Sequence, residues 1–427
     1  MRTQEKVILR NVPTYNPETI KKIIQEGLRD FGLASRIKGN LTIKPNVVMA
    51  HPKIAPSAFT RAEFLDGLIS ALKEEKKGDL KITLAEKTGA GLPTSRMFKH
   101  AGYPYLKKKH KIKLLPIEES KKRTVHLQKG EIHSKVTTAR EIVDNDFLVY
   151  APKLKSNVLS HGFSAALKLN MGLLLDRERL WNHNYELDKK IVDLLEAGYP
   201  DFIVTDAVEI SLGGNQLTQH GRHLGIVVMA THPLAHDVVC SHILHLDPSR
   251  IPHLRLAKER GYGSLSLDSI QIEGDVSLEE IQKRTKDLDL GFIKVDEVDC
   301  GMRIIAGEPY CTGGCHGIFL DWLYMFKDRK PRLWKKMPPW TVVIGQYRGD
   351  VSASRLMVIG SCSKIQGKVQ ARKRRKIKGC PPKHKDLVLL FFLKAGILNP
   401  LFRLDLILDA YFFLFLSWLR RLIKGRL

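Results

Sequence analysis

Strand-like and helix-like patterns alternate along the first three hundred residues, and this alternation constrains the fold more than any other feature. A segment with helical spacing at residues 61–73, for which Thr60 and Glu63 predict a capping box, is typical of the helices. Short apolar runs of strand length stand at residues 42–48, 81–86, 146–151, 201–206 and 224–229. Such alternation predicts an α/β fold with a largely parallel sheet and helices on both faces.

The pattern changes near residues 285–300, where an Asp-rich stretch precedes the region that holds most of the cysteines. The chain is long enough for two or three domains, because one core is usually built from about 100–200 residues. We expect an α/β ligand-binding domain, a smaller α+β domain that contains the cysteines, and an apolar and basic helical tail. Their predicted ranges are 1–295, 296–385 and 386–427.

Charge and cysteine content narrow the function classes. The 427-residue chain has a net charge of +25, which predicts an anionic partner such as nucleic acid, a lipid surface or an acidic ligand. Its 6 cysteines are too few for a disulfide scaffold. No apolar stretch of signal-peptide length stands near Met1, so we expect a cytoplasmic and reducing compartment.

Basic and amide side chains follow two of the predicted strands, at the edge where ligands bind in open α/β sheets. His161, Ser164 and Lys168 are spaced so that they are expected to share one face of the following helix. Several cations and donors at one edge suit a carboxylate or a phosphate, so we predict an anionic small molecule as ligand. The alternative is that the lysines are solvated and that His161 caps a helix. The predicted ligand-binding residues are Lys44, Asn46, Lys153, Lys155, Ser164, Lys168 and Asn170.

Two residues are candidates for acid–base catalysis. Asp206 is expected at the end of a strand, where a carboxylate can bind a cation or act as a base. His161 stands among the predicted ligand-binding residues. Gly213 and Gly214 follow Asp206 and could let the backbone approach a ligand, although an aspartate followed by glycines is also common in loops.

A group of histidines beginning at His232 raises the question of a metal site. Pro233 at a first helical position places His232 at the helix cap, and the segment lacks the glutamate of a His-Glu-x-x-His site. We therefore expect Thr231 or His232 to cap a helix.

Cysteines in the last third of the chain are candidate ligands of an iron–sulfur cluster. Thiolates hold such clusters, and backbone amides in glycine-rich loops can stabilise the charge on the sulfurs. The Cys-x3-Cys spacing of the closest pair is not the Cys-x2-Cys of ferredoxins or zinc ribbons, so buried or surface thiols remain the alternative. Cys240 lies in an apolar helical run and is expected in the core. The candidate metal ligands are Cys300, Cys311, Cys315, Cys362 and Cys380.

The end of the chain combines a basic tract at residues 368–385 with apolar runs at residues 387–393 and 407–419. Neither apolar run reaches the roughly 18–20 uncharged residues that cross a bilayer, so an interfacial helix with a basic flank is expected. The alternative is a helical pair that packs on the α/β domain or forms a dimer contact. The tract lacks aromatic residues, so stacking on single-stranded nucleic acid is not supported. Because it leads directly into the apolar tail, an anionic membrane surface fits at least as well as nucleic acid, and a solvated loop is the other alternative.

Four short blocks resemble a family called domain of unknown function 362. They are Thr42-Ile-Lys-Pro-Asn-Val-Val, the block from Lys153 through His161 to Lys168-Leu-Asn-Met-Gly172, Val204-Thr-Asp206, and Ala235-His-Asp237. The resemblance extends over roughly residues 5–295. Because many members of that family carry ferredoxin-type segments, it implies an iron–sulfur cluster in the cysteine region. This chain departs from those members, since it has no run of Cys-x2-Cys-x2-Cys.

A second resemblance covers about residues 356–382. Val358-Ile-Gly-Ser-Cys362 followed by Gly379-Cys380-Pro-Pro382 is similar to the cluster-binding end of hydrogenase small subunits. That resemblance implies that Cys362 and Cys380 bind a 4Fe–4S cluster.

The leading hypothesis is a cytoplasmic iron–sulfur protein that binds an anionic small molecule and works with an electron-transfer partner. A peripheral position at the inner face of the membrane is the second location that we consider for it. An iron–sulfur-dependent oxidoreductase is one form of it. The alternatives are a membrane- or nucleic-acid-associated binding protein with structural cysteines, and an enzyme without a cluster that uses Asp206 or His161.

Overall fold

A computed structural model describes most of the chain. The described residues are 5–52, 55–89, 91–180, 186–213, 220–291, 293–380, 382, 386–397 and 404–425. Gly214 and Pro381 lie outside them.

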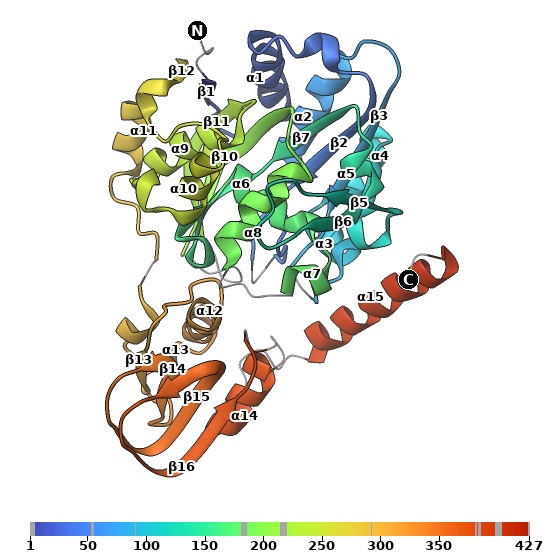
Figure 1. Ribbon diagram of the computed structural model, residues 1–427. Coiled ribbons are helices and arrows are strands. Elements are labelled where there is room, and N and C mark those ends of the chain that lie inside the picture. The colour runs from blue at the N-terminus through green and yellow to red at the C-terminus, as the bar shows by residue number, and fades with distance from the viewer. Residues whose placement is uncertain are drawn as a thin grey trace.

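A ten-stranded sheet forms the centre of the first part of the chain, with its strands in the order β12-β1-β11-β10-β7-β2-β3-β4 and with β8 beside β10 and β9 beside β8 (Figure 1). From β10 to β4 all neighbours are parallel, whereas β11 runs antiparallel to both β1 and β10. The expected α/β fold with a largely parallel sheet is confirmed. The strands are β1 (Glu5–Asn11), β2 (Gly39–Pro45), β3 (Leu80–Glu86), β4 (Lys113–Pro116), β7 (Phe147–Ala151), β8 (Lys153–Asn157), β9 (Gly162–Ser164), β10 (Phe202–Leu212), β11 (His220–Ala230) and β12 (Ile270–Gly274).

Helices cover both faces of this sheet. Along β7, Phe147 and Val149 join one buried apolar cluster while Leu148 and Tyr150 join the other, because side chains alternate between the faces of a strand. A separate antiparallel hairpin pairs β5 (Lys122–His126) with β6 (Lys135–Ala139). The helices of this part are α1 (Pro17–Asp30), α2 (Ala62–Glu74), α3 (Thr94–His100), α4 (Tyr103–His110), α5 (Arg140–Val143), α6 (Ala166–Leu169), α7 (Asp176–Leu180), α8 (Leu187–Asp193), α9 (Pro233–Ile243), α10 (Pro252–Glu259) and α11 (Leu278–Thr285).

Local signals explain where several helices begin. Asn16 caps α1 by accepting hydrogen bonds from the backbone N–H groups of Glu18 and Thr19, each at 3.0 Å, and Pro17 occupies the first turn. The expected capping box of α2 is wrong: Arg61 stands at the N-cap without a side-chain hydrogen bond. Thr60 instead accepts from Asn46 N at 3.0 Å and donates to Ala151 O at 2.7 Å, so its hydroxyl joins the ends of two strands.

A second sheet contains β13 (Arg303–Ala306), β14 (Thr341–Tyr347), β15 (Val351–Ile365) and β16 (Val369–Ile377), and every neighbouring pair in it is parallel. Parallel neighbours normally need a crossover of a dozen or more residues, yet residues 348–350 alone join β14 to β15. The chain leaves Thr341, turns, and returns beside it at Leu356, so the strands are successive turns of a coil. Val343, Val351 and Leu356 fill its interior.

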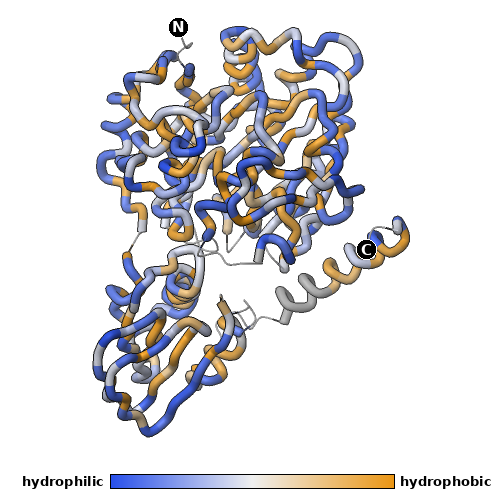
Figure 2. Tube along the Cα trace, in the orientation of Figure 1, coloured by the Kyte–Doolittle hydropathy of each residue, from blue (hydrophilic) through white to orange (hydrophobic). Residues whose placement is uncertain are grey.

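Helices α12 (Cys315–Arg329) and α13 (Pro331–Trp334) connect β13 to β14, and α12 lies between the coil and the large sheet (Figure 1). After β16 the chain forms a π-helical turn (Asp386–Phe391), α14 (Phe392–Ala395) and α15 (Leu404–Ile423). Apolar residues dominate the described side chains of α15 (Figure 2). Among the described residues, no helix is both long enough and apolar enough to cross a membrane.

Candidate functional site

Buried lysines gather where the parallel strands of the large sheet end. Lys44 is the last but one residue of β2, and Lys153 and Lys155 lie on one face of β8 because they are two residues apart in a strand. All three side chains are at most 1% exposed. Lysines are almost never buried without a partner or a function, so the contacts of each ammonium decide what this site can do.

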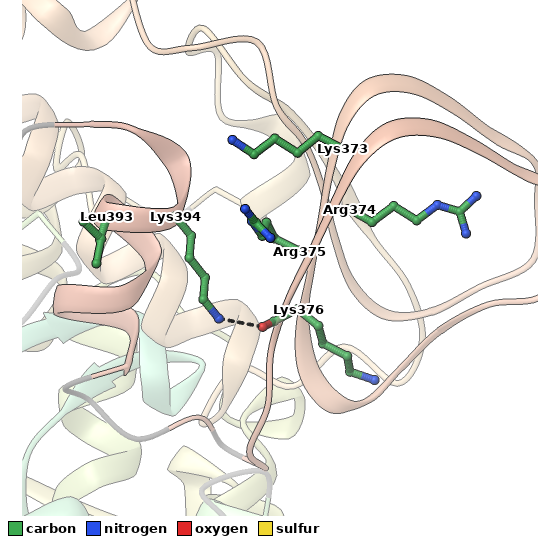
Figure 3. A pocket seen from close by; sticks show the side chains of 6 residues that line it. All are labelled: Lys373, Arg374, Arg375, Lys376, Leu393 and Lys394. Atoms are coloured by element: carbon green, nitrogen blue, oxygen red, sulfur yellow. Dashed lines mark hydrogen bonds between the residues drawn. The ribbon is translucent and has the colours of Figure 1, made fainter.

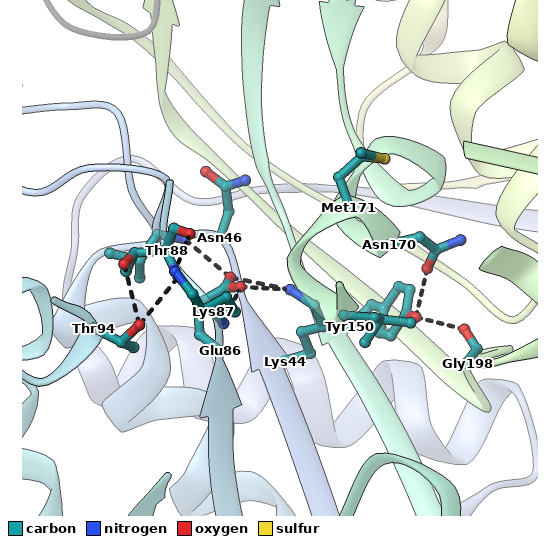
Figure 4. Close-up of polar contacts among 12 residues, drawn as sticks. Lys44, Asn46, Glu86, Lys87, Thr88, Thr94, Tyr150, Asn170, Met171 and Gly198 are labelled. Carbon is teal, nitrogen blue, oxygen red and sulfur yellow. Dashed lines mark hydrogen bonds and ion pairs between the residues drawn. The ribbon is translucent and has the colours of Figure 1, made fainter. Parts of the chain in front are cut away.

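Lys44 forms an ion pair with Glu86, at the end of β3 (Figure 4). The lysine Nζ lies 2.9 Å from Glu86 Oε1 and 3.0 Å from Oε2. Burial lowers the pKa of Lys44 and raises the pKa of Glu86, and the attraction between the two groups opposes both shifts. A Cβ at Gly172 would collide with both charged groups, which explains a glycine at that position.

Lys153 forms the second buried ion pair, with Asp206. Its Nζ lies 3.1 Å from Asp206 Oδ2 and 2.7 Å from the hydroxyl of Tyr15, which donates to Asp206 Oδ1 at 2.8 Å. The backbone N–H of Arg61 also donates to Asp206 Oδ2, at 3.1 Å. Both carboxylate oxygens are therefore occupied by donors from three other parts of the chain.

The expected position of Asp206 at a strand end is wrong. β10 continues past it to Leu212, with an irregular register between Ala207 and Glu209 where the pairing with β11 shifts. The apolar run ends at Asp206 because the carboxylate meets Lys153 inside the fold, not because the strand ends.

Lys155 differs from the other two because it has no carboxylate partner among the described residues. Its Nζ lies 3.1 Å from Asn46 Oδ1 and 3.4 Å from Ala58 O. Burial, and then the charge of Lys168, lower the pKa of Lys155 to about 7. A buried ammonium with only neutral acceptors favours the arrival of an anion, which would repay its lost hydration.

Lys168 extends the same positive region. It is half-buried on α6 and, within the described part of the chain, forms neither a direct hydrogen bond nor an ion pair. Burial, and then the charge of Arg179, lower the pKa of Lys168 to about 8. Asp321 on α12 is close enough to oppose the shifts at both Lys168 and Lys155, so the cysteine-containing part of the chain borders this site.

The expected helical face of His161, Ser164 and Lys168 is wrong. His161 has a φ of 52° and Gly162 a φ of 132°, and two consecutive residues with positive φ cannot continue a helix. Ser164 instead lies in β9, opposite Lys155, and only Lys168 lies in a helix.

Asn170 closes the site from the side of Tyr150, whose hydroxyl lies 2.6 Å from Asn170 Oδ1 and 2.5 Å from Gly198 O (Figure 4). The side chain of Asn170 is fully buried, and its Nδ2 has no hydrogen-bond acceptor among the described residues. The structure thus brings together spare donors from β8, α6 and the turn that follows α6.

His161 lies between this lysine-lined site and the cysteines. Its Nε2 is 3.1 Å from Asp188 Oδ2 and 3.2 Å from Thr312 Oγ1. Asp188 also contacts His253 Nδ1, at 3.2 Å. Burial alone would raise the pKa of Asp188, but the hydrogen bonds from the two histidines lower it.

Four thiols converge at the start of α12. Cys311 precedes this helix, Cys315 is its first residue, Cys362 lies in β15, and Cys380 follows β16. Burial, and then the nearby Cys380 and Cys362 thiols, raise the pKa of Cys311 to about 12. Cys315 responds to the same neighbours, and the thiols of Cys362 and Cys380 interact by a hydrogen bond.

Glycines and backbone amides surround these sulfurs. A Cβ at Gly314 would overlap Cys311 Sγ, and one at Gly360, whose φ is +101°, would lie 3.0 Å from Cys315 Sγ. The backbone N–H groups of Cys315 and Gly314 hydrogen-bond Cys311 and lower its pKa, against the effect of burial. Amides aimed at sulfur stabilise thiolate charge, as in iron–sulfur sites.

Cys300 lies outside the four-thiol site, which consists of Cys311, Cys315, Cys362 and Cys380. Its Sγ is 3.7 Å from Met302 O, and its charged neighbours are Asp299 and Lys335. In the described ranges, no three His, Cys, Asp or Glu side chains are arranged to hold a metal ion. A 4Fe–4S cluster separates its four thiolates further than one ion does, because each binds a different iron.

Two other expectations concern residues away from these sites. His232 caps α9, with its Nδ1 accepting from Ala235 N at 3.3 Å, which confirms the expected cap. Cys240 is fully buried on α9, as expected for a core residue.

Sequence reasoning did not find Glu86, Tyr15 or Thr312. Glu86 ends a strand that the sequence predicts, so the parallel pairing of β2 with β3 was a usable signal for its contact with Lys44. Tyr15 and Thr312 reach the site from loops far away in the sequence, and nothing in their local sequence marks them.

The fold and the two sites define an α/β protein with buried lysines at its strand ends and an adjoining four-thiol site. Residues 41–242 match the model of a family described as domain of unknown function (DUF362), which confirms the resemblance over those residues. No curated protein sequence matches the chain.

Two solved structures are similar over much of their length. The lactate racemase apoprotein from Thermoanaerobacterium thermosaccharolyticum is 14% identical, with a TM-score of 0.35, and the match covers 79% of this chain and 69% of that one. A Thermotoga maritima protein is 10% identical, with a TM-score of 0.38, and the match covers 78% and 71%. At these TM-scores, neither structure supports an argument about function.

Proposed function

We propose that this chain is an iron–sulfur protein that holds a 4Fe–4S cluster on Cys311, Cys315, Cys362 and Cys380. The observation that carries the proposal is the convergence of these four thiols from a loop, a helix start and two turns of a coil. Four thiols from distant parts of the sequence that meet in one place suit a ligand that all four can bind. The glycines at Gly314 and Gly360 leave the room that sulfur requires.

The lysine-lined site, made of Lys44, Lys153, Lys155 and Lys168, would bind an anionic small molecule. Glu86 and Asp206 neutralise two of its ammonium groups through short ion pairs. Lys155 and Lys168 keep donors that no carboxylate among the described residues engages directly. A carboxylate or phosphate would gain charge-assisted hydrogen bonds from both.

The bound cluster would supply electrons, or a Lewis acid, beside that ligand. The side chains of this chain would orient the ligand, hold a proton and position the cysteine loop. Lys155 and Lys168 would orient the anion, and a lysine with a pKa of about 7 can hold or release a proton near neutral pH. His161 would position the cysteine loop against Asp188 through its shared Nε2 contacts.

Iron content tests the cluster. Anaerobically purified protein should absorb visible light and contain iron and sulfide, and Cys315→Ala or Cys380→Ala should each remove most of both. Cys300→Ala is the matched control, because this cysteine lies in the same part of the chain but outside the four-thiol site. Colourless, iron-free wild-type protein would overturn the proposal, and so would iron loss from Cys300→Ala alone.

Anion binding is tested separately by calorimetry with inorganic phosphate and with acetate. We expect at least one of them to bind, and Lys168→Met to weaken that binding by about tenfold, the value of one charge-assisted hydrogen bond. Lys107→Met, at an exposed position on α4, should leave it unchanged. Equal binding by all three proteins would show that the anion goes elsewhere.

A further inference from the structure

Helix α15 has two opposite faces, and among its described side chains one face contacts the rest of the protein while the other is exposed. Arg420 donates to Glu119 Oε1 at 2.7 Å and to Ser95 Oγ at 3.0 Å, and the Arg96 guanidinium lies 4.9 Å from the Phe413 ring centre. Phe413, the buried Ser417 and Arg420 recur every three or four residues. At about 100° per residue, they form one face of the helix.

The opposite face of α15 is apolar and exposed. Phe412, Phe415, Trp418 and Leu422 lie on it, and Phe412 and Phe415 are each 56% exposed. Ile423 at the helix end is 76% exposed. Large apolar side chains gathered on one exposed face mark a surface that is covered by something else.

A cationic groove lies at the start of the same tail, between β16 and α14 (Figure 3). It has a volume of about 460 Å³ and is lined by Lys373, Arg374, Arg375, Lys376, Leu393 and Lys394. None of these five cations pairs with a carboxylate in the described part of the chain. Leu393 is 77% exposed among them, so the groove presents apolar surface beside concentrated positive charge.

We propose that the exposed face of α15 and the cationic groove dock the protein on an anionic lipid membrane. The apolar face would enter the boundary between headgroups and acyl chains, and the cations would meet the lipid phosphates. This inference does not depend on the proposed cluster.

Other occupants fit these two features less well. A second copy of the chain also has a net charge of +25 and would bring the same cationic groove, and like charges repel. Nucleic acid could neutralise the groove but would leave the apolar face of α15 exposed to water. An anionic membrane would cover the apolar face of α15 and also neutralise the cationic groove.

Vesicle flotation tests the proposal with the full-length protein. Wild type should float with phosphatidylcholine vesicles that contain phosphatidylserine or phosphatidylglycerol, and much less with pure phosphatidylcholine. Salt at about 1 M should weaken the binding, because it screens surface charge. Phe415→Ser with Trp418→Ser, and Lys373→Glu with Arg375→Glu, should each lower the bound fraction by about tenfold or more.

Two matched controls separate this surface from general charge and apolarity. Lys107→Glu with Lys108→Glu reverses two exposed charges on α4, and Leu333→Ser removes an exposed apolar side chain on α13. Both should float like wild type. Inorganic phosphate at millimolar concentration should not release the protein from the vesicles. Release by phosphate would show that the groove binds free anions and not a lipid surface.

Three results would overturn the inference. They are flotation that is equal with neutral vesicles, loss of flotation in the control variants, and no flotation at all. A dimer that Phe415→Ser with Trp418→Ser dissociates, without vesicle binding, would assign the face to a second copy. Salt-sensitive binding to a DNA duplex without vesicle binding would assign the groove to nucleic acid.

Discussion

Thr312 Oγ1 lies 3.2 Å from His161 Nε2, and this contact joins the loop that carries Cys311 to the large sheet. The same nitrogen lies 3.1 Å from Asp188 Oδ2, so one imidazole atom serves two parts of the fold. A Cβ at Gly317 would lie 2.7 Å from Leu159, which shows how closely α12 packs beside this contact.

Replacing His161 with asparagine should loosen the attachment of the cysteine-containing part. Asparagine tolerates the left-handed φ of 52°, so the backbone is kept while the imidazole contacts are lost. We expect a stability loss of about 1 kcal/mol, since the lost hydrogen bonds join half-buried partners that water can partly satisfy. Faster proteolysis between residues 286 and 302 should accompany it. His245→Asn is the control, since His245 has a φ of 56° and, within the described residues, its side chain hydrogen-bonds the end of α11. Equal effects of both variants would argue against a coupling role.

Gly360→Ala should remove the cluster, whereas Gly261→Ala should not. Both glycines have positive φ, +101° and +82°, so each substitution carries a strain of roughly 1–2 kcal/mol. Only the Cβ at Gly360 would lie 3.0 Å from Cys315 Sγ, while nothing lies within 4 Å of the one at Gly261. The urea midpoint of each variant measures the backbone strain that both substitutions share. The iron content per chain measures the crowding at Cys315 that only Gly360→Ala should cause. Similar iron content in the two variants would contradict the expected closeness of sulfur and backbone.

Asp206→Asn should destabilise the protein by about 3–5 kcal/mol, because Lys153 would remain buried without its counter-charge. The double variant Lys153→Met with Asp206→Leu should recover much of that loss, since it removes both charges. Urea unfolding, monitored by circular dichroism, measures the unfolding free energy of both variants. A double variant that is less stable than Asp206→Asn would show that Tyr15 or Arg61 depends on the carboxylate more than Lys153 does.

Lys155→Met should stabilise the protein most at low pH. The pKa of Lys155 is about 7 in the folded protein and about 10.4 in an unfolded chain, so between these values only the unfolded state holds the proton. The unfolding free energy of wild type therefore rises by about 1.4 kcal/mol per pH unit through this group. The advantage of the methionine variant should be full near pH 6 and should shrink towards about pH 10. An advantage that does not change with pH would show that Lys155 titrates normally.

The large sheet was predictable because its signal is local. Each strand carries its own apolar run, and the helices between them leave few topologies for a parallel sheet. The buried lysines were predictable for the same reason, since Lys44 and Lys153 stand next to such runs. Which carboxylate faces each lysine depends on strand order, and the sequence alone does not set it.

The helical spacing of side chains gave a wrong prediction where the backbone turns. His161, Ser164 and Lys168 have helical spacing, but that period says nothing of the positive φ at His161 and Gly162. The cysteines posed the opposite difficulty. Their separations match no familiar ligation pattern, because Cys362 and Cys380 are brought together by the register of a coil and not by a short loop.

The four thiols differ in how far water reaches them. Cys315 is buried and Cys311 half-buried on the side of His161, whereas Cys362 is exposed at the outer surface of the coil. A ligand shared by the four thiols would therefore be enclosed at Cys315 and open to solvent, and so to other molecules, at Cys362.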